Sequence, residues 1–396
     1  MDLRKSIKSV SLADVEQQSK KLTSMMREIK SVMLAPQESK TPPVFGSGEI
    51  QTLCGIDKAK LSYRLTLKDL PGGAVKEKRR EWSLLEAQSW VRSFRADCLR
   101  PKGASAVTIT VANFKGGVAK TTSAVSLAQG LSLMGHKVLL VDLDPQASAT
   151  TLFGVIPSSQ TDSDQTALSL FNGDQDSIDY AIRKTYWEGI DLVGASPALF
   201  GAEFGLPARQ KDDPGFEFWK VLDFGLDFAR SNYDVIVIDT PPSLSYITIN
   251  AMLAADGIVI PIPPSALDFA SSAQFWDLFS DLCQQLYAGG REQKTFEFID
   301  VLMSRVESND TASSVVRQWI MEAYGDKVLP IEIPKTSVAA SAAAEFGTVY
   351  DVDRSTVAAK TYDRARNAYD RYCSLVEEQI RAVWEKQVAE LSKEML

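Results

Sequence analysis

The sequence predicts an α/β fold built on a parallel sheet, preceded by a single helix and a small helical domain. From Ser105 onward, apolar runs rich in Val, Ile and Leu alternate with helix-forming segments. The runs 138–141 and 235–238 contain no polar residue, which is typical of strands buried on both faces of a parallel sheet. We therefore expect strands at 106–112, 137–142, 234–239, 257–262, 296–303 and 327–333, and a long helix from about residue 355 to 396.

Composition is that of a water-soluble globular chain. It has 396 residues, of which 45% are hydrophobic, so it can bury a large core, and its length suggests about two or three domains. No apolar run approaches the roughly 18 residues of a membrane span, and residues 1–5 lack a signal-peptide character, so we expect a cytoplasmic protein. The four cysteines lie far apart and His136 is the single histidine. The cysteine spacing therefore predicts no zinc site and no disulfide framework. With one histidine, we also expect no histidine catalysis.

Residues 115–122, Lys-Gly-Gly-Val-Ala-Lys-Thr-Thr, lie between an apolar run and a helix-forming run. Adjacent glycines let the backbone approach polyphosphate, and main-chain N–H groups at the start of a helix point at an anion. Lys120 can place a charge on the phosphates, and Thr121 can offer its hydroxyl to Mg²⁺. The loop departs from the common pattern because Ala119 replaces a usual glycine and an extra lysine, Lys115, precedes the glycines. The predicted nucleotide contacts are Lys115, Gly116, Gly117, Val118, Ala119, Lys120, Thr121 and Thr122.

Three aspartates follow predicted strands. Asp142 ends the run 137–142 and Asp144 follows two residues later, while Asp239 ends the run 234–239. Parallel strands present their carboxyl ends at one edge of the sheet, so these carboxylates should meet the loop there. Asp239 is placed like a Walker B aspartate, which commonly holds Mg²⁺ through water. A single aspartate in such a place is usually a turn or cap residue, but the three in order after a phosphate loop favour a nucleotide site.

The N-terminal part divides into two segments. From 12 to 33 the pattern is helical, and Leu22, Met26, Ile29 and Met33 form a short coiled-coil seam that needs a partner surface. We therefore expect residues 1–36 to be a dimerisation helix. A linker rich in proline and polar residues follows at 35–43.

Residues 44–100 have the pattern of a winged helix-turn-helix. We expect helices at 47–53 and 57–67, a turn at 71–73, a basic hairpin at 76–80, and a helix opened by the capping box Ser83-x-x-Glu86. Candidate DNA contacts are Lys58, Lys60, Ser62 and Arg64 in the second helix and Lys76, Lys78, Arg79 and Arg80 in the wing. A small helical domain with a merely basic surface is the alternative.

Charge is distributed unevenly along the chain, whose net charge is −8. Residues 1–100 hold 19 Lys and Arg against 12 Asp and Glu, whereas residues 101–396 hold 24 against 39. A basic first quarter on an acidic body favours nucleic-acid contacts near the N-terminus, although a solvated charged surface would have the same composition.

Three motifs together resemble those of a known family. Residues 115–122, 142–150 and 239–242 resemble the deviant Walker A, Walker A′ and Walker B motifs of the ParA/MinD ATPases, and the resemblance extends over about residues 105–370. The segment 261–264 followed by Asp268-Phe269 resembles plasmid partition ParA proteins, and we include Pro263 and Pro264 among the expected nucleotide contacts. The N-terminal helix and winged helix-turn-helix resemble the longer ParA class, including RepA of repABC plasmids.

The resemblance implies roles for individual residues of an ATPase domain at 105–396. Lys115 would be the signature lysine that reaches the partner's phosphates in an ATP-sandwich dimer. Lys120 and Thr121 would bind phosphate and Mg²⁺ within the subunit, Asp144 would orient the attacking water, and Asp142 and Asp239 would hold Mg²⁺ through water. Near the C-terminus, Arg354, Lys360, Arg364 and Arg366 lie where the family binds non-specific DNA, or else form ordinary helix ion pairs.

The function implied is that of a plasmid partition ATPase which uses ATP, ADP and Mg²⁺, forms a homodimer and hydrolyses ATP weakly. DNA and a ParB-type centromere-binding partner would stimulate hydrolysis, the protein would associate with the nucleoid, and it would repress its own operon by binding the operator. A MinD-like membrane-cycling ATPase is one alternative, disfavoured by the acidic stretch 377–394. An iron–sulfur reductase is a second alternative, disfavoured because no cysteine lies near the nucleotide motifs to bind a cluster. A nucleotide-responsive repressor without a partition role is the third.

Overall fold

The computed structural model describes residues 9–33, 40–77, 79–157, 163–288, 293–307, 311–338, 342 and 346–394. Lys78 and the side chain of Met33, for which the sequence makes predictions, lie outside this description. The chain divides into two compact units, Met1–Thr41 and Pro42–Leu396. Among the described residues, no helix combines the length and the apolar character needed to cross a membrane.

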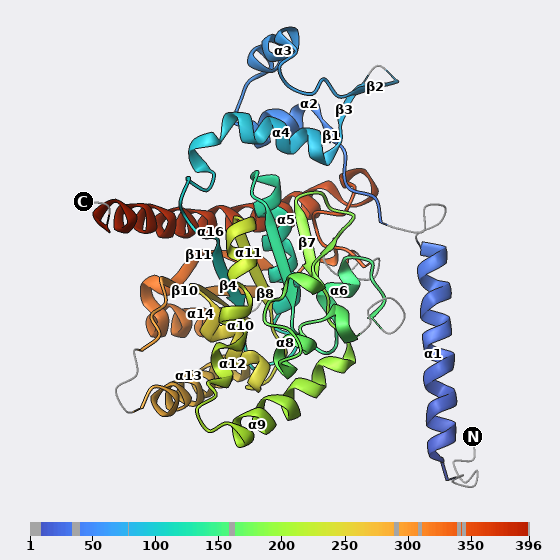
Figure 1. Ribbon diagram of the computed structural model, residues 1–396. Coiled ribbons are helices and arrows are strands. Elements are labelled where there is room, and N and C mark those ends of the chain that lie inside the picture. The colour runs from blue at the N-terminus through green and yellow to red at the C-terminus, as the bar shows by residue number, and fades with distance from the viewer. Residues whose placement is uncertain are drawn as a thin grey trace. The chain divides into compact units, whose positions relative to one another are not determined.

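Helix α1 (Leu12–Met33) forms most of the described part of the first unit (Figure 1). Its start is capped reciprocally, because Ser11 Oγ accepts from the Asp14 amide at 3.2 Å and Asp14 Oδ2 accepts from the Ser11 amide at 2.8 Å. The helix predicted over 12–33 is confirmed. The seam residues Leu22, Met26 and Ile29 are between 38% and 52% exposed within this chain.

The second unit is built around an eight-stranded sheet in the order β11-β10-β9-β4-β8-β5-β7-β6 (Figure 1). The strands are β4 (Val107–Val111), β5 (Val138–Asp142), β6 (Arg183–Lys184), β7 (Ile190–Val193), β8 (Val235–Asp239), β9 (Gly257–Ile262), β10 (Phe298–Val306) and β11 (Val328–Pro334). Neighbours pair in parallel except β6 with β7. All six predicted strands are present, so the α/β fold with a mainly parallel sheet is confirmed.

Apart from the short β6, the strands contribute residues to two separate hydrophobic clusters, one on each face of the sheet. Helices α5 (Lys120–Leu133) and α16 (Ala359–Glu394) cover one face, and α10 (Val221–Gly225) and α12 (Tyr246–Ala254) cover the other. Further α-helices are α6 (Ser148–Leu152), α8 (Leu168–Asn172), α9 (Ala202–Asp212), α11 (Asp227–Asn232), α13 (Ala266–Leu286) and α14 (Thr311–Tyr324).

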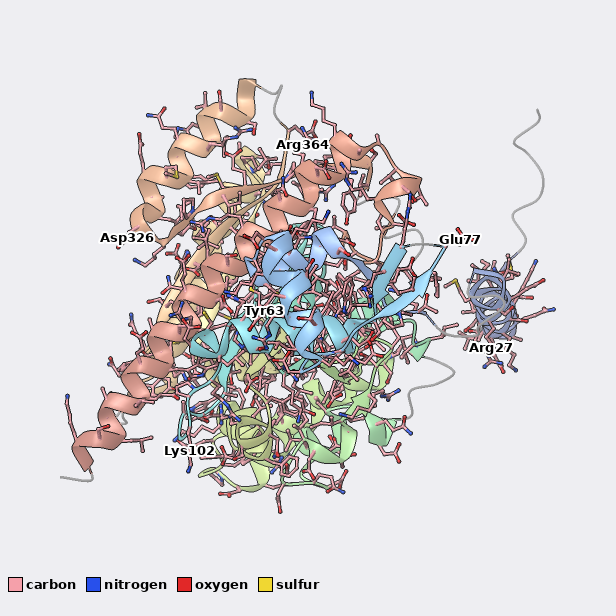
Figure 2. The ribbon with its side chains drawn as sticks, turned by 90° about the horizontal axis from the view of Figure 1, so that it is seen from above. Arg27, Tyr63, Glu77, Lys102, Asp326 and Arg364 are labelled. Carbon is pink, nitrogen blue, oxygen red and sulfur yellow. The ribbon has the colours of Figure 1, made fainter. Side chains whose placement is uncertain are left out.

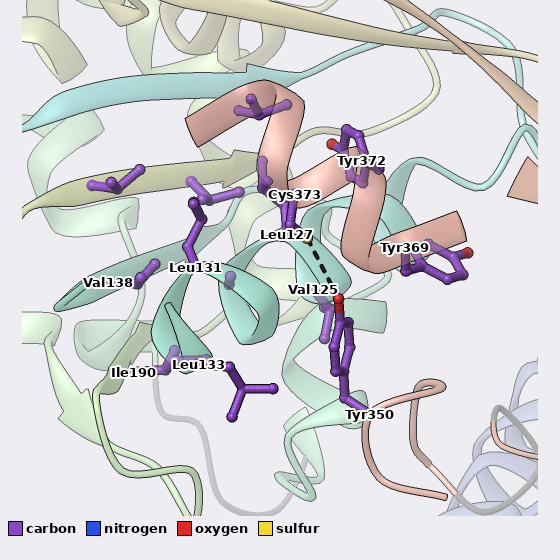
Figure 3. Packing of buried hydrophobic residues seen from close by; sticks show 14 of the residues in the cluster. Val125, Leu127, Leu131, Leu133, Val138, Ile190, Tyr350, Tyr369, Tyr372 and Cys373 are labelled. Carbon is purple, nitrogen blue, oxygen red and sulfur yellow. Dashed lines mark hydrogen bonds between the residues drawn. The ribbon is translucent and has the colours of Figure 1, made fainter. Parts of the chain in front are cut away.

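Helices α5 and α16 approach each other closely at Gly130. A Cβ at this glycine would lie 2.3 Å from the Sγ of Cys373, so a larger residue would push the two helices apart. Cys373 and Tyr350 form a hydrogen bond beside this contact (Figure 3). The long C-terminal helix is therefore a structural layer that packs with α5 on the same face of the sheet.

Residues 45–94 form a small subdomain of the second unit. It contains β1 (Phe45–Gly46), α2 (Ser47–Cys54), α3 (Lys58–Leu67), β2 (Ala74–Lys76), β3 (Arg79–Trp82) and α4 (Leu84–Phe94), with the strands in the order β1-β3-β2. Gly55, at φ 63°, ends α2, and Asp57 caps α3 by accepting from the Lys60 amide at 2.7 Å. The predicted helices and the Ser83–Glu86 capping box are confirmed.

Helix α4 is attached to the end of α5. Gln88 Nε2 donates to Ser132 Oγ at 2.7 Å, and Arg92 Nε donates to the Gly135 carbonyl at 2.8 Å. The single histidine, His136, is buried in the loop that follows α5 and bonds to Glu377 of α16 at 2.6 Å. Helix α5 thus joins the loop at 115–119, at its start, to the 45–94 subdomain, at its end.

Candidate functional site

The loop between β4 and α5 adopts the conformation that a phosphate-binding nest needs. Gly117 and Ala119 both have left-handed backbone angles, φ 77° and 73°. For an alanine this conformation costs about 1–2 kcal/mol, which a glycine would avoid. The structure therefore explains the departure in sequence: Ala119 keeps the glycine conformation at an energetic cost. Asn113 stabilises the start of the loop, because its Oδ1 accepts a hydrogen bond from the Lys115 amide at 3.0 Å.

Lys120, the first residue of α5, is buried among the strand-end carboxylates. Its Nζ donates to the Lys115 carbonyl at 2.9 Å, which folds the side chain across the loop. Burial lowers the pKa of Lys120, and the charges of Asp239 and Asp144 oppose that effect. The predicted phosphate lysine and the predicted carboxylates are therefore close enough to interact electrostatically.

Asp142 is a buried and firmly held carboxylate. Its Oδ2 accepts from the amide and the hydroxyl of Thr150, at 2.8 and 2.7 Å, and its Oδ1 accepts from the Asp144 amide at 3.1 Å. Burial nevertheless raises the pKa of Asp142 to about 7. Asp144, just beyond the strand, is also mostly buried and accepts from the Gln146 amide at 2.9 Å.

Asp239 lies opposite Asp142 in the β5–β8 register, and neither of its buried oxygens accepts a hydrogen bond from a described residue. Burial, followed by the nearby Asp142, raises the pKa of Asp239 well above its usual range. The Thr121 hydroxyl is near enough to lower that pKa without completing a hydrogen bond. A buried charge needs a partner, and the Asp239 carboxylate has none among the described residues. Together with the Thr121 hydroxyl, it could hold a cation partly through water. The described residues contain no cluster of three metal-ligating side chains, so phosphate and water oxygens would have to complete the shell.

Lys115 lines a cavity of about 320 Å³ beside the loop. Its Nζ is 2.7 Å from Asp268 Oδ1 in the first turn of α13. The cavity is lined by Lys115, Gly116, Gly117, Pro263, Pro264, Ser265, Asp268, Arg305, Glu307, Ser313 and Lys335. The prolines predicted as nucleotide contacts therefore share this cavity with the glycines of the loop.

A larger cavity of about 710 Å³ adjoins the first and shares Gly117, Arg305, Glu307 and Lys335 with it. It is lined by Gly117, Ala119, Thr122, Arg305, Glu307, Ile333, Pro334, Lys335, Thr336, Ser337 and Tyr369. Sequence reasoning missed Arg305, Lys335 and Thr336. The available signal was positional, because all three follow or end predicted strands at the same edge of the sheet as the phosphate loop.

The candidate DNA contacts of the 45–94 subdomain differ in environment. Lys58, Lys60 and Ser62 are exposed on α3, as is Tyr63 (Figure 2). Arg64 instead pairs with Asp69 at 2.7 Å and lies over the ring of Phe94. In the hairpin, Lys76 and Arg79 are exposed, whereas Arg80 donates to the Gly72 carbonyl.

The C-terminal candidates also separate into two kinds. Lys360 and Arg364 are exposed on α16 (Figure 2). Arg366 is held between Asp370, at 3.0 Å, and the ring of Tyr350, at 4.3 Å from its centroid. Arg354 pairs with Asp363 at 2.7 Å. The ordinary helix ion pair of the alternative interpretation is therefore present for Arg366, whereas Arg354 precedes α16 and pairs with an aspartate in its first two turns.

The fold and the loop together define a P-loop nucleotide-binding protein, and comparisons with known proteins agree. Residues 106–288 match a family described as an AAA domain. A replication protein A of Sinorhizobium fredii is 32% identical over 73% of this chain and 72% of its own length. The chromosome partitioning protein ParA of Caulobacter vibrioides is 30% identical over 60% of this chain and 84% of its own length. The chain belongs to the ParA family of partition ATPases.

A solved structure extends the comparison to a bound ligand. The structure of cobyrinic acid a,c-diamide synthase from Mycobacterium smegmatis, with ADP and magnesium bound, superposes with a TM-score of 0.53. It is 28% identical and covers 68% of this chain and 93% of the other.

Proposed function

We propose that this protein is a DNA-partition ATPase that binds ATP with Mg²⁺ and uses slow hydrolysis to switch between two states. The observation that supports the proposal is that Lys120, Thr121 and three aspartates lie together beside one loop. The aspartates are Asp142, Asp144 and Asp239, and the loop has left-handed backbone conformations at Gly117 and Ala119. The ADP and magnesium in the related synthase structure support the choice of ligand.

Each residue has a role that its surroundings support. Lys120, buried and cationic, neutralises phosphate charge inside the chain. Thr121 would bind Mg²⁺, with Asp239 and Asp142 acting through water; when bound, the metal would offset the charge of the phosphate oxygens. Asp144, mostly buried yet at the end of its strand, would orient the attacking water.

Lys115 would act across a dimer interface. Its side chain pairs with Asp268 in the first turn of α13 and lines the cavity there, and 33% of it is exposed. A charge that reaches a γ-phosphate only in the partner subunit makes association depend on that phosphate. Hydrolysis then removes the bridge, and the dimer of ATPase domains opens.

Residues 1–36 would provide a second, nucleotide-independent contact. The exposed seam of α1 presents Leu22, Met26 and Ile29 at coiled-coil spacing, and burying it against a second copy would stabilise a helix that is marginal alone. The ATPase domains of two chains would then remain tethered when they separate.

The 44–100 region would bind operator DNA as a winged helix-turn-helix and so repress the protein's own operon. The exposed face of α3 with Lys58, Lys60 and Ser62 suits the major groove, and the hairpin basic residues suit the flanking phosphates. Arg64, paired with Asp69, would position α3 instead of reading bases. The attachment of α4 to α5 supports a dependence of operator binding on the nucleotide state.

In the ATP state the protein would coat non-specific DNA, follow a ParB-type partner and associate with the nucleoid. Lys360 and Arg364, exposed in an acidic body, would contribute phosphate contacts, and Arg366 would contribute least because Asp370 already neutralises it. Replacing Lys360 and Arg364 by Gln should weaken binding to random DNA while operator binding persists. Equal binding of random DNA by the double variant and the wild type would remove these residues from the proposal.

Hydrolysis by the full chain tests the function as a whole. Phosphate release should be slow with ATP and Mg²⁺ alone, and should rise when random DNA and the DNA-binding product of the adjacent gene are added together. Lys120→Ala is the control for contaminating ATPases. Absence of hydrolysis under every condition, in protein that is folded, would contradict the proposal.

A further inference from the structure

Two side chains at the end of β10 form hydrogen bonds to the backbone of the phosphate loop. Ser304, which is fully buried, donates from its hydroxyl to the Val118 carbonyl at 2.9 Å. The next residue, Arg305, donates from Nη1 to the Gly117 carbonyl. Two consecutive side chains of one strand therefore bind two consecutive carbonyls of the loop.

The backbone at Arg305 is unusual. Arg305 has φ +52°, a left-handed conformation that costs an arginine energy and persists only where the surrounding structure fixes it. The pairing of β10 with β11 changes register between Met303 and Val306, so Arg305 lies in a bulge-like irregularity. Such irregularities commonly redirect a side chain next to a functional site. Here the redirected guanidinium lines both cavities beside the loop.

Fixing these carbonyls also fixes the amides that follow them. In a trans peptide the C=O and the N–H point in opposite directions. When the carbonyls of Gly117 and Val118 are bound on the β10 side, the N–H groups of Val118 and Ala119 face the opposite side, where successive loop amides form an anion-binding concavity. This support matters most at Ala119, whose left-handed conformation lacks the ease of a glycine.

We propose that Ser304 and Arg305 are positioning residues of the phosphate loop, which hold the Val118 and Ala119 amides ready for the polyphosphate of a nucleotide. Arg305 in addition keeps a positive charge at the wall between the two cavities. The proposal rests on the proposed function, because it assumes that the loop binds a nucleotide.

Two substitutions of Arg305 separate its side chain from its backbone. Arg305→Ala removes the hydrogen bond and keeps the strained φ, whereas Arg305→Gly removes the hydrogen bond and relaxes φ. Both should bind ADP–Mg²⁺ and a non-hydrolysable ATP analogue roughly tenfold more weakly in titration calorimetry. Arg305→Lys keeps a donor and a charge and should lose less. Arg317→Ala is the matched control, since Arg317 bonds to the Glu307 carbonyl beside this region.

A positioning role predicts a specific kinetic and exchange signature. KM for ATP should rise while kcat changes little, because Lys115 and Asp144 remain. In nucleotide-free protein, amide hydrogen exchange of 116–119 should accelerate, and that of β4 should not. Ser304→Ala should also raise the KM for ATP and accelerate exchange at 116–119. If the loss of this buried hydroxyl unfolds the chain, the Arg305→Gly variant still tests the proposal.

The outcomes distinguish this inference from the function on which it rests. Wild-type protein that binds neither nucleotide would contradict the proposed function. Wild-type protein that binds, together with Arg305→Ala and Arg305→Gly variants of equal affinity and unchanged exchange, would overturn the positioning role.

Discussion

Lys115 and Asp268 form an ion pair between the phosphate loop and the start of α13, with Nζ 2.7 Å from Oδ1. Asp268 is fixed there, because Ser265 caps α13 and its hydroxyl bonds to the second carboxylate oxygen of Asp268. A lysine that has to reach the phosphates of another subunit must first leave or share this carboxylate. In the proposed ATP-bound dimer, the pair would therefore restrain Lys115.

Asp268→Asn should strengthen ATP-dependent association, since it removes the competing charge and keeps the side-chain shape. The dimer dissociation constant with an ATP analogue should fall several-fold in sedimentation experiments. The wild type and the Asp268→Asn variant should both be measured with the additional substitution Met26→Lys. This change places a charge in the α1 seam and weakens its pairing, so that the measured association is that of the ATPase domains. Asp277→Asn, an exposed aspartate on the same helix, is the matched control. Weaker association of Asp268→Asn would mean that Asp268 positions Lys115 for the partner.

Asp144→Ala should bind ATP normally and hydrolyse it roughly a hundredfold more slowly, because the carboxylate that orients water is removed and the phosphate ligands remain. Calorimetry and phosphate release measure the two properties separately. The variant should also stay longer on random DNA in the presence of ATP. Turnover at the wild-type rate would assign the role to Asp142 or to another group.

Removing the basic residues of the hairpin should weaken operator binding. Replacing Lys76, Lys78, Arg79 and Arg80 by Gln should lower the slope of log affinity against log salt by about 0.9 for each DNA phosphate that is no longer neutralised. ATP hydrolysis should persist, and Lys102→Gln, in the segment between the subdomain and β4, is the control. An unchanged affinity and salt slope would leave the hairpin as an ordinary charged surface.

Asp300 should make stability depend on pH. It is buried in β10 with Oδ2 unpartnered among the described residues, and burial raises its pKa to about 7 from 3.8. The folded state therefore keeps a proton that the unfolded state loses, so this contribution is complete below about pH 4 and is lost as pH rises through 7. Denaturant unfolding without nucleotide should show stability falling from pH 5 to 8. The fall should be smaller, by up to a few kcal/mol, in Asp300→Asn and unchanged in the exposed control Asp326→Asn. Identical pH profiles for wild type and Asp300→Asn would contradict this.

The sequence predicted every central strand because Val- and Ile-rich runs of this length are typical of buried strands and of little else. It missed β7 (Ile190–Val193), which is short and interrupted by Asp191, a carboxylate that accepts from the Tyr233 hydroxyl at 2.7 Å. Lys115, Lys120 and the three aspartates could be singled out as candidate site residues because each lies in a local sequence motif. Arg305 was not, since its position depends on a register shift between distant strands. The packing of Arg366 against Tyr350 is non-local in the same way.

In the proposed mechanism, Lys115 completes the site of the partner subunit. Phosphate release from an equimolar mixture of Lys115→Ala and Asp144→Ala proteins tests this role. Each variant alone should be nearly inactive, but both bind ATP, and a mixed dimer contains one complete site: the Lys115→Ala subunit with its own Asp144 and the lysine of its partner. Random mixing should recover roughly a quarter of the wild-type rate. If Lys115 acts within its own subunit, no mixed dimer contains a complete site, and a mixture no more active than its components would contradict the account.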